Sequence, residues 1–428
     1  MMDVGCQMMG DRKNLNLNLN LNLNLNLNLN KKVMIIKRRE FLKISSLAAA
    51  SLLMPNFLKS MTLDHALNPG QKILIVLQFT GGNDGLNTVI PTRNDIYFKE
   101  RGDISIKDSL ALNDETGINP ALSYFKELHN NGELSVLNNV GYPDPNKSHF
   151  RSMDIWHSAS KSDEFLETGW LGRFLDEECY SCDHPTQALE VDDMLSLALK
   201  GDNNKAFAFK DPKRLYQTSQ EKYFKSLYDD HHHDDETVSY LYQTLGSTIN
   251  NAEYIFEKSK AKKTDQTYPN SQLGKDFRTV ASLIKSDINT QVYYLSIGSF
   301  DTHVNQNERQ QKLFGEINEA VKSFVADMKA NGKFNDILLM TFSEFGRRVS
   351  QNASKGTDHG TANQMFFISG GLKKKGTLNP LPDLQNLNEG DLIYTEDFRK
   401  VYATVLKNWL QADSSRVLGW KNGVYDFI

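Results

Sequence analysis

Carboxylate and imidazole side chains stand beside apolar runs at four places in this sequence. Asp and Glu oxygens and His nitrogens form the mixed ligand set that divalent metals take in proteins. Taken singly, each residue is more typical of a turn or a helix cap than of a metal ligand. Taken together they predict a metal site, with these ligands: Asp84, Asp301, His303, Glu344 and His359.

The segment "GTDHGTANQ" (Gly356–Gln364) supplies the last of these ligands. By itself it is typical of a polar loop bounded by glycines. Because a strand end elsewhere presents Asp301 and His303, His359 is the expected third ligand of the same ion. The neighbouring Asp358 is expected to support that histidine, as a further member of the metal site.

Four apolar runs predict the strands that must position these residues. The first run is continuously apolar, as expected for a strand covered on both faces. A helical pattern in Gln311–Gly332 shows that helices lie between the runs. Alternating strands and helices predict an α/β fold with a mostly parallel central sheet, whose ligands bind beyond the carboxyl ends of the strands. The predicted strands are Lys72–Phe79, Gln291–Gly298, Asp336–Phe342 and Met365–Ser369.

A hydroxyl and a guanidinium lie near the start of one further predicted helix. After a loop that contains two prolines, this helix is expected to begin at Ser148. The positive end of a helix dipole suits an anion or a developing alkoxide, so Ser148 is a candidate nucleophile. Arg151, one turn on, is a candidate clamp for an oxyanion. The alternative is that Ser148 only caps the helix; His149 and His157 are expected to be structural or to support the site.

Two other groups of potential ligands carry a weaker signal. The run "DDHHHDDE" (Asp229–Glu236) has no flanking strands, so we expect a solvated helix or lid insertion, with adventitious metal binding as the alternative. Cys179 and Cys182 form a C-x-x-C pair, and the third cysteine is Cys6. Without a second pair, local packing or a disulfide is favoured over a zinc site.

Composition excludes some classes of partner. The chain has 428 residues, of which 39% are hydrophobic and 24% charged, so its length allows one large α/β domain or two smaller ones. Lys and Arg number 49 against 53 Asp and Glu, a net charge of −4. This balance provides no global basic field, and nucleic acid is therefore not an expected partner.

Residues Asn14–Asn30 alternate Asn and Leu with a period of two. Such low-complexity repeats seldom build a packed core. Residues 1–33 are therefore expected to form a leader that is disordered, or untranslated if Met34 is the true start. Mass spectrometry of the amino terminus tests whether the leader is translated. Detection of peptides from Asn14–Asn30 would contradict a start at Met34.

The next segment resembles a twin-arginine export signal. Arg38 and Arg39 precede an apolar stretch, Ile44–Met54, that is too short to span a bilayer comfortably. A cytosolic amphipathic helix and a retained anchor are the alternatives. We expect residues 34–67 to be the signal and residues 68–428 to be one α/β domain, exported by the twin-arginine machinery to the periplasm or cell envelope. No transmembrane segment is expected beyond the signal.

From about Lys72 to Ile428 the sequence resembles the domain of unknown function 1501 family, whose members are bacterial and are grouped with the alkaline phosphatase and sulfatase superfamily. The resemblance implies an alkaline-phosphatase-like three-layer sandwich, with helices on both faces of a mostly parallel sheet and a helical insertion. The motifs that carry it are "LQFTGGNDGLNTVIP", "GYPDPNKSHFRSMDIWHSA", "TGWLGRFLD", "SFDTH", "TFSEFGRR", "GTDHGTA" and "DFRKVYATVLKNWL".

The superfamily uses two metals, commonly zinc, around a serine, threonine or modified cysteine nucleophile. The resemblance therefore implies that Ser148 is the nucleophile and that Asp301 and His303 hold one metal. It further implies that His359 completes this site and that Asp84 matches the aspartate after the first strand. Mg²⁺, Mn²⁺ and Ca²⁺ are the alternatives to zinc.

This sequence departs from the superfamily pattern at Ser343 and Glu344, where other members usually carry an Asp-His dipeptide. The change removes a nitrogen ligand from the second site, which favours one metal, or a harder ion at that site. No C-x-P-x-R-like segment is present, so a modified cysteine is not expected.

The sequence thus predicts an exported, metal-dependent hydrolase of phosphate or sulfate esters, acting on an anionic small molecule or polymer, with a metal-activated serine nucleophile. The alternative is an inactive, metal-stabilised binding or assembly protein of the cell envelope with the same fold.

Overall fold

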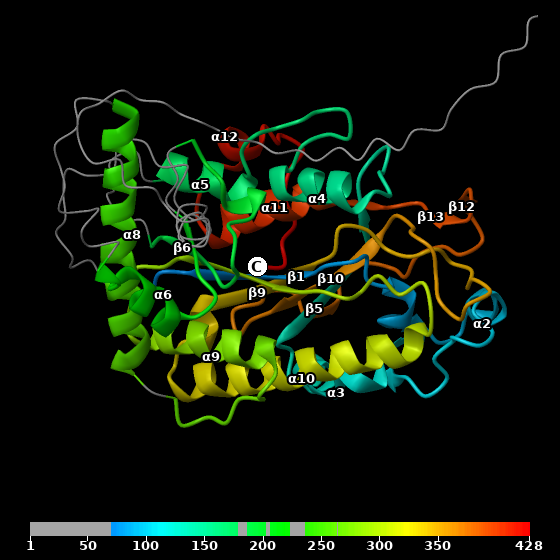
Figure 1. Ribbon diagram of the computed structural model, residues 1–428. Helices are drawn as coiled ribbons and strands as arrows, with labels where there is room; N and C mark the ends of the chain where they lie inside the picture. The colour runs from blue at the N-terminus through cyan, green and yellow to red at the C-terminus, as the bar shows by residue number, and fades with distance from the viewer. Residues whose placement is uncertain (1–69, 179–185, 203–205, 223–235, 263) are drawn as a thin grey trace, which may run out of the picture. The chain divides into compact units, whose positions relative to one another are not determined.

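The computed structural model describes most of the chain after the signal segment (Figure 1). The predicted leader and signal lie outside the described residues, as do the three cysteines and the acidic and histidine-rich run up to Asp235. No helix in the described part is long and apolar enough to cross a membrane. The described residues are 70–178, 186–202, 206–222, 236–262, of which 236–247 only as backbone, and 264–428.

Strand β1 (Ile73–Phe79) is buried along its whole length. Successive side chains of a strand point to opposite faces, so alternate residues enter two different hydrophobic clusters. Ile75 and Leu77 pack in one cluster, while Leu74 and Val76 pack in the other. The continuous apolar run in the sequence is therefore explained by a sheet that is covered on both faces.

The central sheet is mostly parallel, as predicted. Its order is β11-β5-β10-β9-β1-β8-β6-β7, with β14 also pairing with β5. Only β10 runs antiparallel to its two neighbours. The other strands of this sheet are β5 (Leu134–Gly141), β6 (Ala188–Glu190), β7 (Ala206–Ala208), β8 (Val292–Ile297), β9 (Ile337–Phe342), β10 (Asn363–Ile368), β11 (Gly376–Thr377) and β14 (Glu396–Asp397).

Two small sheets lie outside the central one. A three-stranded sheet follows β1 in the chain, and a two-stranded sheet follows β11. Their strands are β2 (Val89–Pro91), β3 (Leu110–Ala111), β4 (Thr116–Ile118), β12 (Leu387–Asn388) and β13 (Asp391–Leu392).

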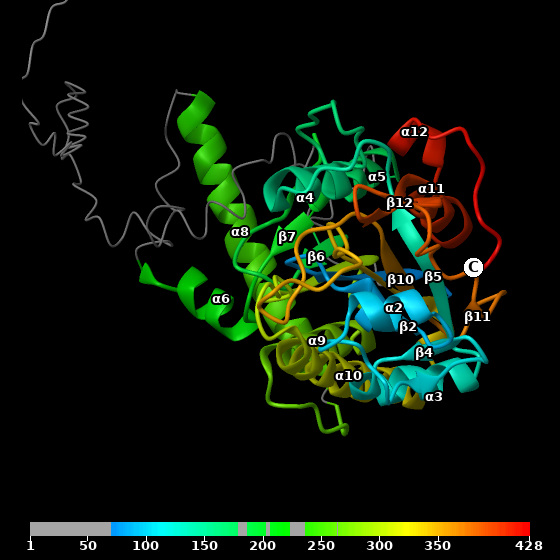
Figure 2. The ribbon, with the colours of Figure 1, turned by 90° about the vertical axis from the view of Figure 1, so that its right-hand side faces the viewer.

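Helices cover both faces of the sheet, which confirms the predicted layers. In both views α3, α9 and α10 lie on one face, while α4, α5, α11 and α12 lie on the other (Figures 1 and 2). The α-helices are α2 (Asp95–Glu100), α3 (Ser123–Asn130), α4 (His149–Ser158), α5 (Trp170–Glu178), α6 (Pro212–Ser219), α8 (Glu236–Ala261), α9 (Gln272–Lys285), α10 (Gln306–Ala330), α11 (Phe398–Thr404) and α12 (Ser414–Leu418). Shorter helices are η1 (Gly85–Asn87), η2 (Pro120–Leu122), η3 (Leu197–Leu199), η4 (Phe334–Asp336) and the π-helix η5 (Val405–Trp409).

Helix α10 confirms the predicted periodicity but begins five residues earlier than the pattern indicated. Its residues Ile317, Val321, Phe324 and Met328 are fully buried at three- and four-residue spacing. The helix ends at Ala330, and Gly332 follows with a positive φ of 66°. Glycine accepts this left-handed conformation without the steric penalty of a Cβ.

Strand direction gathers the candidate site at one edge of the sheet. β5, β1, β8 and β9 all point the same way, so the segments after them emerge at the same edge. Because β10 runs in the opposite direction, the segment before it reaches this edge too. The loop before α4, the loop after β8 and "GTDHGTANQ" therefore meet although they are far apart in the sequence.

Glu190, at the end of β6, gives the fold a pH dependence that can be measured. Burial raises the pKa of Glu190 from 4.5 to about 8, although the backbone N–H of Ser196 donates to its carboxylate at 2.6 Å. The folded state keeps this carboxyl protonated at pH values where the unfolded chain has lost the proton. This group therefore destabilises the fold progressively as pH rises from about 4.5 to about 8, by up to a few kcal/mol.

We expect Glu190→Gln to raise the melting temperature at pH 8 and to change it little at pH 5. The reason is that an amide keeps the hydrogen bond from Ser196 but has no charge to desolvate. Calorimetry at both pH values checks this, with the exposed Glu115→Gln as the control. An equal shift at pH 5 and pH 8 would contradict it.

Candidate metal centre

Three histidine side chains converge on the carboxylate of Asp301 at the shared sheet edge. His303 Nε2 lies 3.0 Å and His359 Nε2 3.2 Å from Asp301 Oδ1. His149 Nε2 lies 3.7 Å from Oδ2 of the same carboxylate. The ligand atoms of His149, Asp301 and His359 all lie within 4.8 Å of one another. These are the separations expected of side chains that share one ion.

The other ring nitrogen of each histidine has its own acceptor. His359 Nδ1 lies 2.9 Å from the carbonyl oxygen of Lys147, which can only accept a hydrogen bond. That contact puts the proton of a neutral imidazole on Nδ1 and leaves a lone pair on Nε2. His303 Nδ1 is 3.1 Å from Asp358 Oδ1, and the pair is arranged in the same way. Such outer partners orient metal-binding histidines in known sites.

His149 also has an outer partner for one of its ring nitrogens. Its Nδ1 lies 2.9 Å from Oε1 of Glu344, and its Nε2 is buried with no hydrogen-bond partner among the described residues. A buried polar atom without a partner destabilises a fold unless something binds it. This nitrogen faces Asp301 Oδ2 at 3.7 Å, and an ion held between the two atoms would give it a partner.

The distance between two imidazoles gives a further test of fit. His303 Nε2 and His359 Nε2 lie 3.1 Å apart. Two nitrogens bound tetrahedrally to one zinc ion at its usual bond length lie about 3.3 Å apart. Partial burial lowers the pKa of His359, which favours the neutral ring that binds a metal. The residues present therefore fit a centre of three imidazoles and one carboxylate.

Arg347 keeps Asp301 charged and oriented. Partial burial would raise the pKa of Asp301, but the guanidinium of Arg347, together with His359 and His303, lowers it to about 2. Arg347 is itself fully buried and donates to Asp301 Oδ1 at 2.6 Å. It also donates to the carbonyl oxygens of Gly82 and Thr357 at 2.7 and 2.9 Å, so its position is fixed.

Two glycines allow the site loops to approach each other. Gly81 has a φ of +118°, and a Cβ there would lie 2.5 Å from the backbone nitrogen of Asp301. A Cβ at Gly356 would lie 2.2 Å from the carbonyl carbon of His303. Both contacts are too short for any other residue, so the loops that flank β1 and β10 pack closely on the loop that carries two ligands.

Glu344, predicted as a ligand, lies one step behind the centre. It is completely buried, and it accepts hydrogen bonds from the backbone N–H of Gly81 at 2.7 Å and from His149. His149, expected to be structural or supporting, is the residue that faces Asp301 from α4. Strand β5, absent from the predicted strands, delivers the loop before α4 to the same edge and so places His149 there.

Asp84 is not part of this cluster in the described structure. Its carboxylate forms a buried ion pair with Arg101 and accepts from the side-chain amide of Gln306. It also caps η1 through hydrogen bonds from the backbone N–H groups of Leu86 and Asn87, at 3.1 and 3.4 Å. Asp84 is therefore a helix cap, which is the other role that its sequence position allowed.

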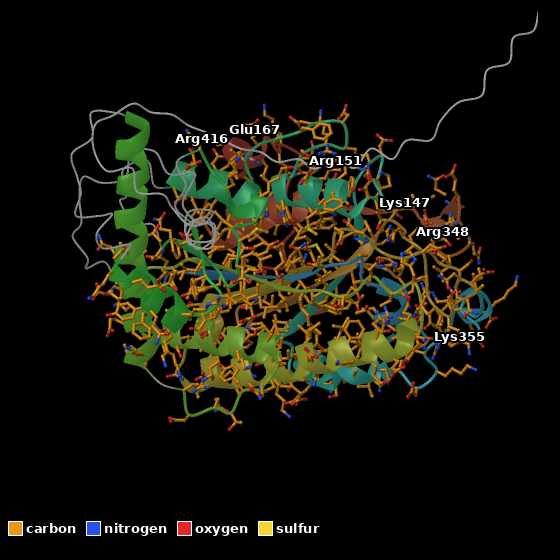
Figure 3. All side chains as sticks on the ribbon, in the orientation of Figure 1. Lys147, Arg151, Glu167, Arg348, Lys355 and Arg416 are labelled. Atoms are coloured by element: carbon orange, nitrogen blue, oxygen red, sulfur yellow. The ribbon has the colours of Figure 1, made fainter. Side chains whose placement is uncertain are left out.

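Ser148 lies at the centre's margin, and Arg151 faces a different partner. Ser148 is exposed at the start of α4, and its side chain makes no capping hydrogen bond. It stands between Lys147, whose carbonyl holds His359, and His149. The guanidinium of Arg151 lies at the surface above α4 (Figure 3), donates to the carbonyl oxygens of Ser162 and Glu164, and stacks on Phe165 at 3.8 Å.

Removing the outer partner of His303 should weaken metal binding without unfolding the chain. We expect Asp358→Ala to lower the affinity for Zn²⁺ about tenfold, since outer partners of this kind contribute 10- to 100-fold. The side chain of Asp358 is 58% exposed, so the melting temperature of the metal-free protein should stay unchanged. Competition with a chelator measures the affinity, with the exposed Asp114→Ala as the control. Equal affinities for both variants would contradict the role given to Asp358.

The comparisons with known proteins agree with the resemblance seen in the sequence. No curated protein matches the chain in sequence. Solved structures that are similar include the PsFucS1 sulfatase from Pseudoalteromonas sp., at 11% identity over 89% of this chain and 71% of that chain, with a TM-score of 0.35. A protein in the alkaline phosphatase superfamily from Vibrio parahaemolyticus is 11% identical over 87% of this chain and 78% of its own, with a TM-score of 0.34.

The alkaline phosphatase from the Antarctic bacterium TAB5 is 10% identical over 73% of this chain and 95% of its own, with a TM-score of 0.33. The family model described as "Protein of unknown function (DUF1501)" matches residues 137–400, which is more than half of the chain and includes all four residues of the centre. The chain therefore belongs to this family.

Proposed function

We propose that the protein is an exported hydrolase of phosphate or sulfate esters that depends on one divalent metal ion. The observation that carries the proposal is the convergence of three imidazole nitrogens on the Asp301 carboxylate. A bound ion would supply Lewis acidity, neutralising the charge that develops on the ester oxygens.

Zinc is the ion that these donors favour. Imidazole nitrogen suits zinc, whereas Mg²⁺ and Ca²⁺ prefer sites built from oxygen ligands. A second ion has less support, because the carboxylate of Asp84 is bound by Arg101 and Glu344 holds His149. We therefore propose one zinc ion, held by these four residues: His149, Asp301, His303 and His359.

Ser148 is the proposed nucleophile. Ser148 lies between Lys147, whose carbonyl oxygen is next to His359 Nδ1, and His149, and its hydroxyl makes no capping hydrogen bond; these features support the role. Its Oγ forms the new bond to phosphorus or sulfur, and the bond from that atom to the alcohol oxygen breaks. The alcohol leaves with the serine proton. Water then cleaves the seryl ester: its hydroxyl group goes to the phosphate or sulfate, and its remaining proton returns to Ser148.

The amino end of α4 is the proposed anion-binding element. The first backbone N–H groups of a helix have no partner within it, and they point toward an anion placed there. Arg151 is bound to loop carbonyls, so an anion role for it requires those contacts to open. Lys147, beside Ser148, pairs with Asp391 while its own side chain stays 39% exposed (Figure 3). It is the better placed cation.

Export by the twin-arginine pathway remains part of the proposal. It rests on Arg38, Arg39 and the short apolar stretch that follows them. A reporter fused to residues 34–67 should reach the periplasm, and replacing both arginines by lysine should stop it. Unchanged export of the doubly substituted reporter would contradict the pathway.

Metal removal and reloading tests the function as a whole. We expect the purified protein to hydrolyse generic aryl phosphates or sulfates, to lose this activity on chelation and to regain it with Zn²⁺. One tightly bound metal with no turnover of either ester class would contradict the hydrolase proposal. That result would favour the alternative of a metal-stabilised binding or assembly protein.

A further inference from the structure

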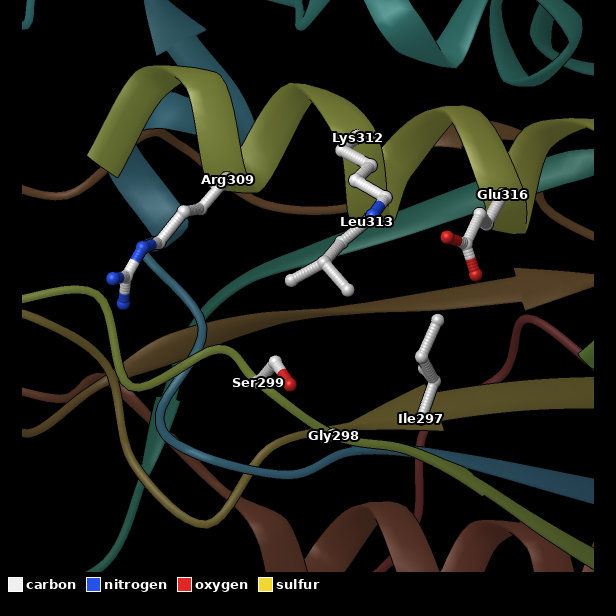
Figure 4. A pocket seen from close by; sticks show the side chains of 7 residues that line it. All are labelled: Ile297, Gly298, Ser299, Arg309, Lys312, Leu313 and Glu316. Carbon is white, nitrogen blue, oxygen red and sulfur yellow. The ribbon is translucent and has the colours of Figure 1, made fainter. Parts of the chain in front are cut away.

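A cavity of about 490 Å³ lies where α10 passes over the loop after β8. Its wall includes Ile297, Ser299 and the helix residues Arg309, Leu313 and Glu316. Figure 4 shows the side chains of the three helix residues directed toward the strand end and its loop. A volume of this size is typical of a site for a small ligand or for one unit of a larger one.

The cavity lining combines three kinds of chemistry. Arg309 and Lys312 are exposed cations, and within the described residues neither has a hydrogen-bond or ion-pair partner. Their donors suit an oxyanion, for which the arginine fork is especially well shaped. Glu316 lies about two turns along the helix from Arg309 and can accept hydrogen bonds from hydroxyl groups. Leu313 lies between the charged residues and offers an apolar contact.

Ser299 adds a hydroxyl group in an unfavourable backbone conformation. Its φ of 77° is the largest positive value among the described residues other than glycine. A side chain in this left-handed region is strained, and glycine would be accepted there more easily. The strained serine is exposed and lines the cavity. A residue kept in this conformation despite the strain points to a use for its hydroxyl.

The cavity and the metal centre share one loop. Ser299 precedes Asp301 by two residues, so their Cα atoms are at most about 7 Å apart. At the other end of the loop, α10 begins with Gln306, whose side chain accepts hydrogen bonds from Thr302 at 3.2 Å and from Thr357. The cavity therefore adjoins the loop that carries Asp301 and His303.

We propose that this cavity binds an anionic saccharide unit next to the ester that is hydrolysed, so that the substrate is a polyanionic saccharide. Arg309 and Lys312 bind the anionic group, Ser299 and Glu316 bind ring hydroxyls, and Leu313 covers the carbon face of the ring. The assignment of this unit as part of a substrate rests on the proposed function. The binding site itself can be tested without turnover.

The test is calorimetric binding of dextran sulfate to the zinc-loaded protein, with uncharged dextran as the ligand control. We expect Arg309→Ala to weaken binding of dextran sulfate about tenfold, which is the effect of one lost charge-assisted hydrogen bond. Lys322→Ala removes the same charge from an exposed position farther along α10 and should leave binding unchanged. Ser299→Gly should weaken binding while leaving the melting temperature equal or higher.

Equal losses for Arg309→Ala and Lys322→Ala would overturn the proposal, because binding would then reflect general surface charge. Equal binding of dextran and dextran sulfate would overturn it as well. Lys322→Ala should hydrolyse a simple aryl ester at the wild-type rate, because Lys322 lies outside the cavity lining. If selective binding is found but no ester is hydrolysed, the proposed function fails while the saccharide site stands. If aryl esters are hydrolysed without selective binding, only the saccharide site fails.

Discussion

Replacing His359 with alanine is expected to remove the bound metal and, with it, ester hydrolysis. His359 Nε2 lies 3.1 Å from His303 Nε2 and 3.2 Å from Asp301 Oδ1, so its loss opens one quarter of the proposed coordination shell. Zinc content should fall from about one ion per chain to about a tenth of that or less, and hydrolysis by about 10³-fold or more. Elemental analysis after gel filtration and an aryl-ester assay measure the two effects.

His129→Ala is the matched control for this experiment. His129 is a half-buried histidine of α3, on the face of the sheet opposite α4, and is not part of the centre. Its replacement should leave the zinc content and activity at the wild-type level. Retention of one zinc ion per chain by His359→Ala would show that the ligands are assigned to the wrong residues.

Replacing Ser148 with alanine is expected to abolish turnover but to preserve metal binding. Loss of the nucleophile should lower kcat by about 10³-fold or more, because residual catalysis then depends on binding and electrostatics alone. Zinc content should stay the same, since no ligand is removed. The melting temperature should also be retained, because the side chain of Ser148 makes no capping hydrogen bond.

Ser105→Ala provides the comparison for a serine outside the site. The hydroxyl group of Ser105 donates to the carbonyl oxygen of Gly102 at 3.3 Å in an exposed loop. This variant should hydrolyse esters at the wild-type rate. Full activity in Ser148→Ala would exclude the seryl intermediate and leave direct attack by water as the mechanism.

The position of the site along the sheet edge could be predicted from the sequence. Continuous apolar runs identified β1, β8, β9 and β10, and residues at strand ends in an α/β sheet share an edge. Asp301, His303 and His359 meet there in the structure. Local sequence was sufficient for this, because each residue directly adjoins a strand or its loop.

The exchange between Glu344 and His149 could not be predicted in the same way. Glu344 and His149 both lie at the edge of the sheet where the parallel strands end. Only the direction of the side chain decides which of the two faces Asp301. Glu344 is turned inward to the backbone N–H of Gly81, and His149 lies between these two carboxylates. This arrangement depends on the position of β5 in the sheet, which no local pattern revealed.

Asp84 and Arg151 also differ from their predicted roles, because each has a partner that is distant in the sequence or lies in another loop. Asp84 is paired with Arg101, which lies at the end of α2, and no periodicity shows that this arginine turns inward. Arg151 is held by carbonyl groups of the loop that follows α4. In both cases a guanidinium finds its acceptors through the tertiary fold, and sequence spacing alone gives no account of such contacts.

The most direct test of the metal centre is anomalous diffraction at the zinc absorption edge from crystals of the zinc-loaded protein. We predict one strong peak at about 2.0–2.2 Å from four ligand atoms. These are the Nε2 atoms of His149, His303 and His359 and one carboxylate oxygen of Asp301. A peak bound by Asp84 or Glu344, or no peak at this edge of the sheet, would contradict the account.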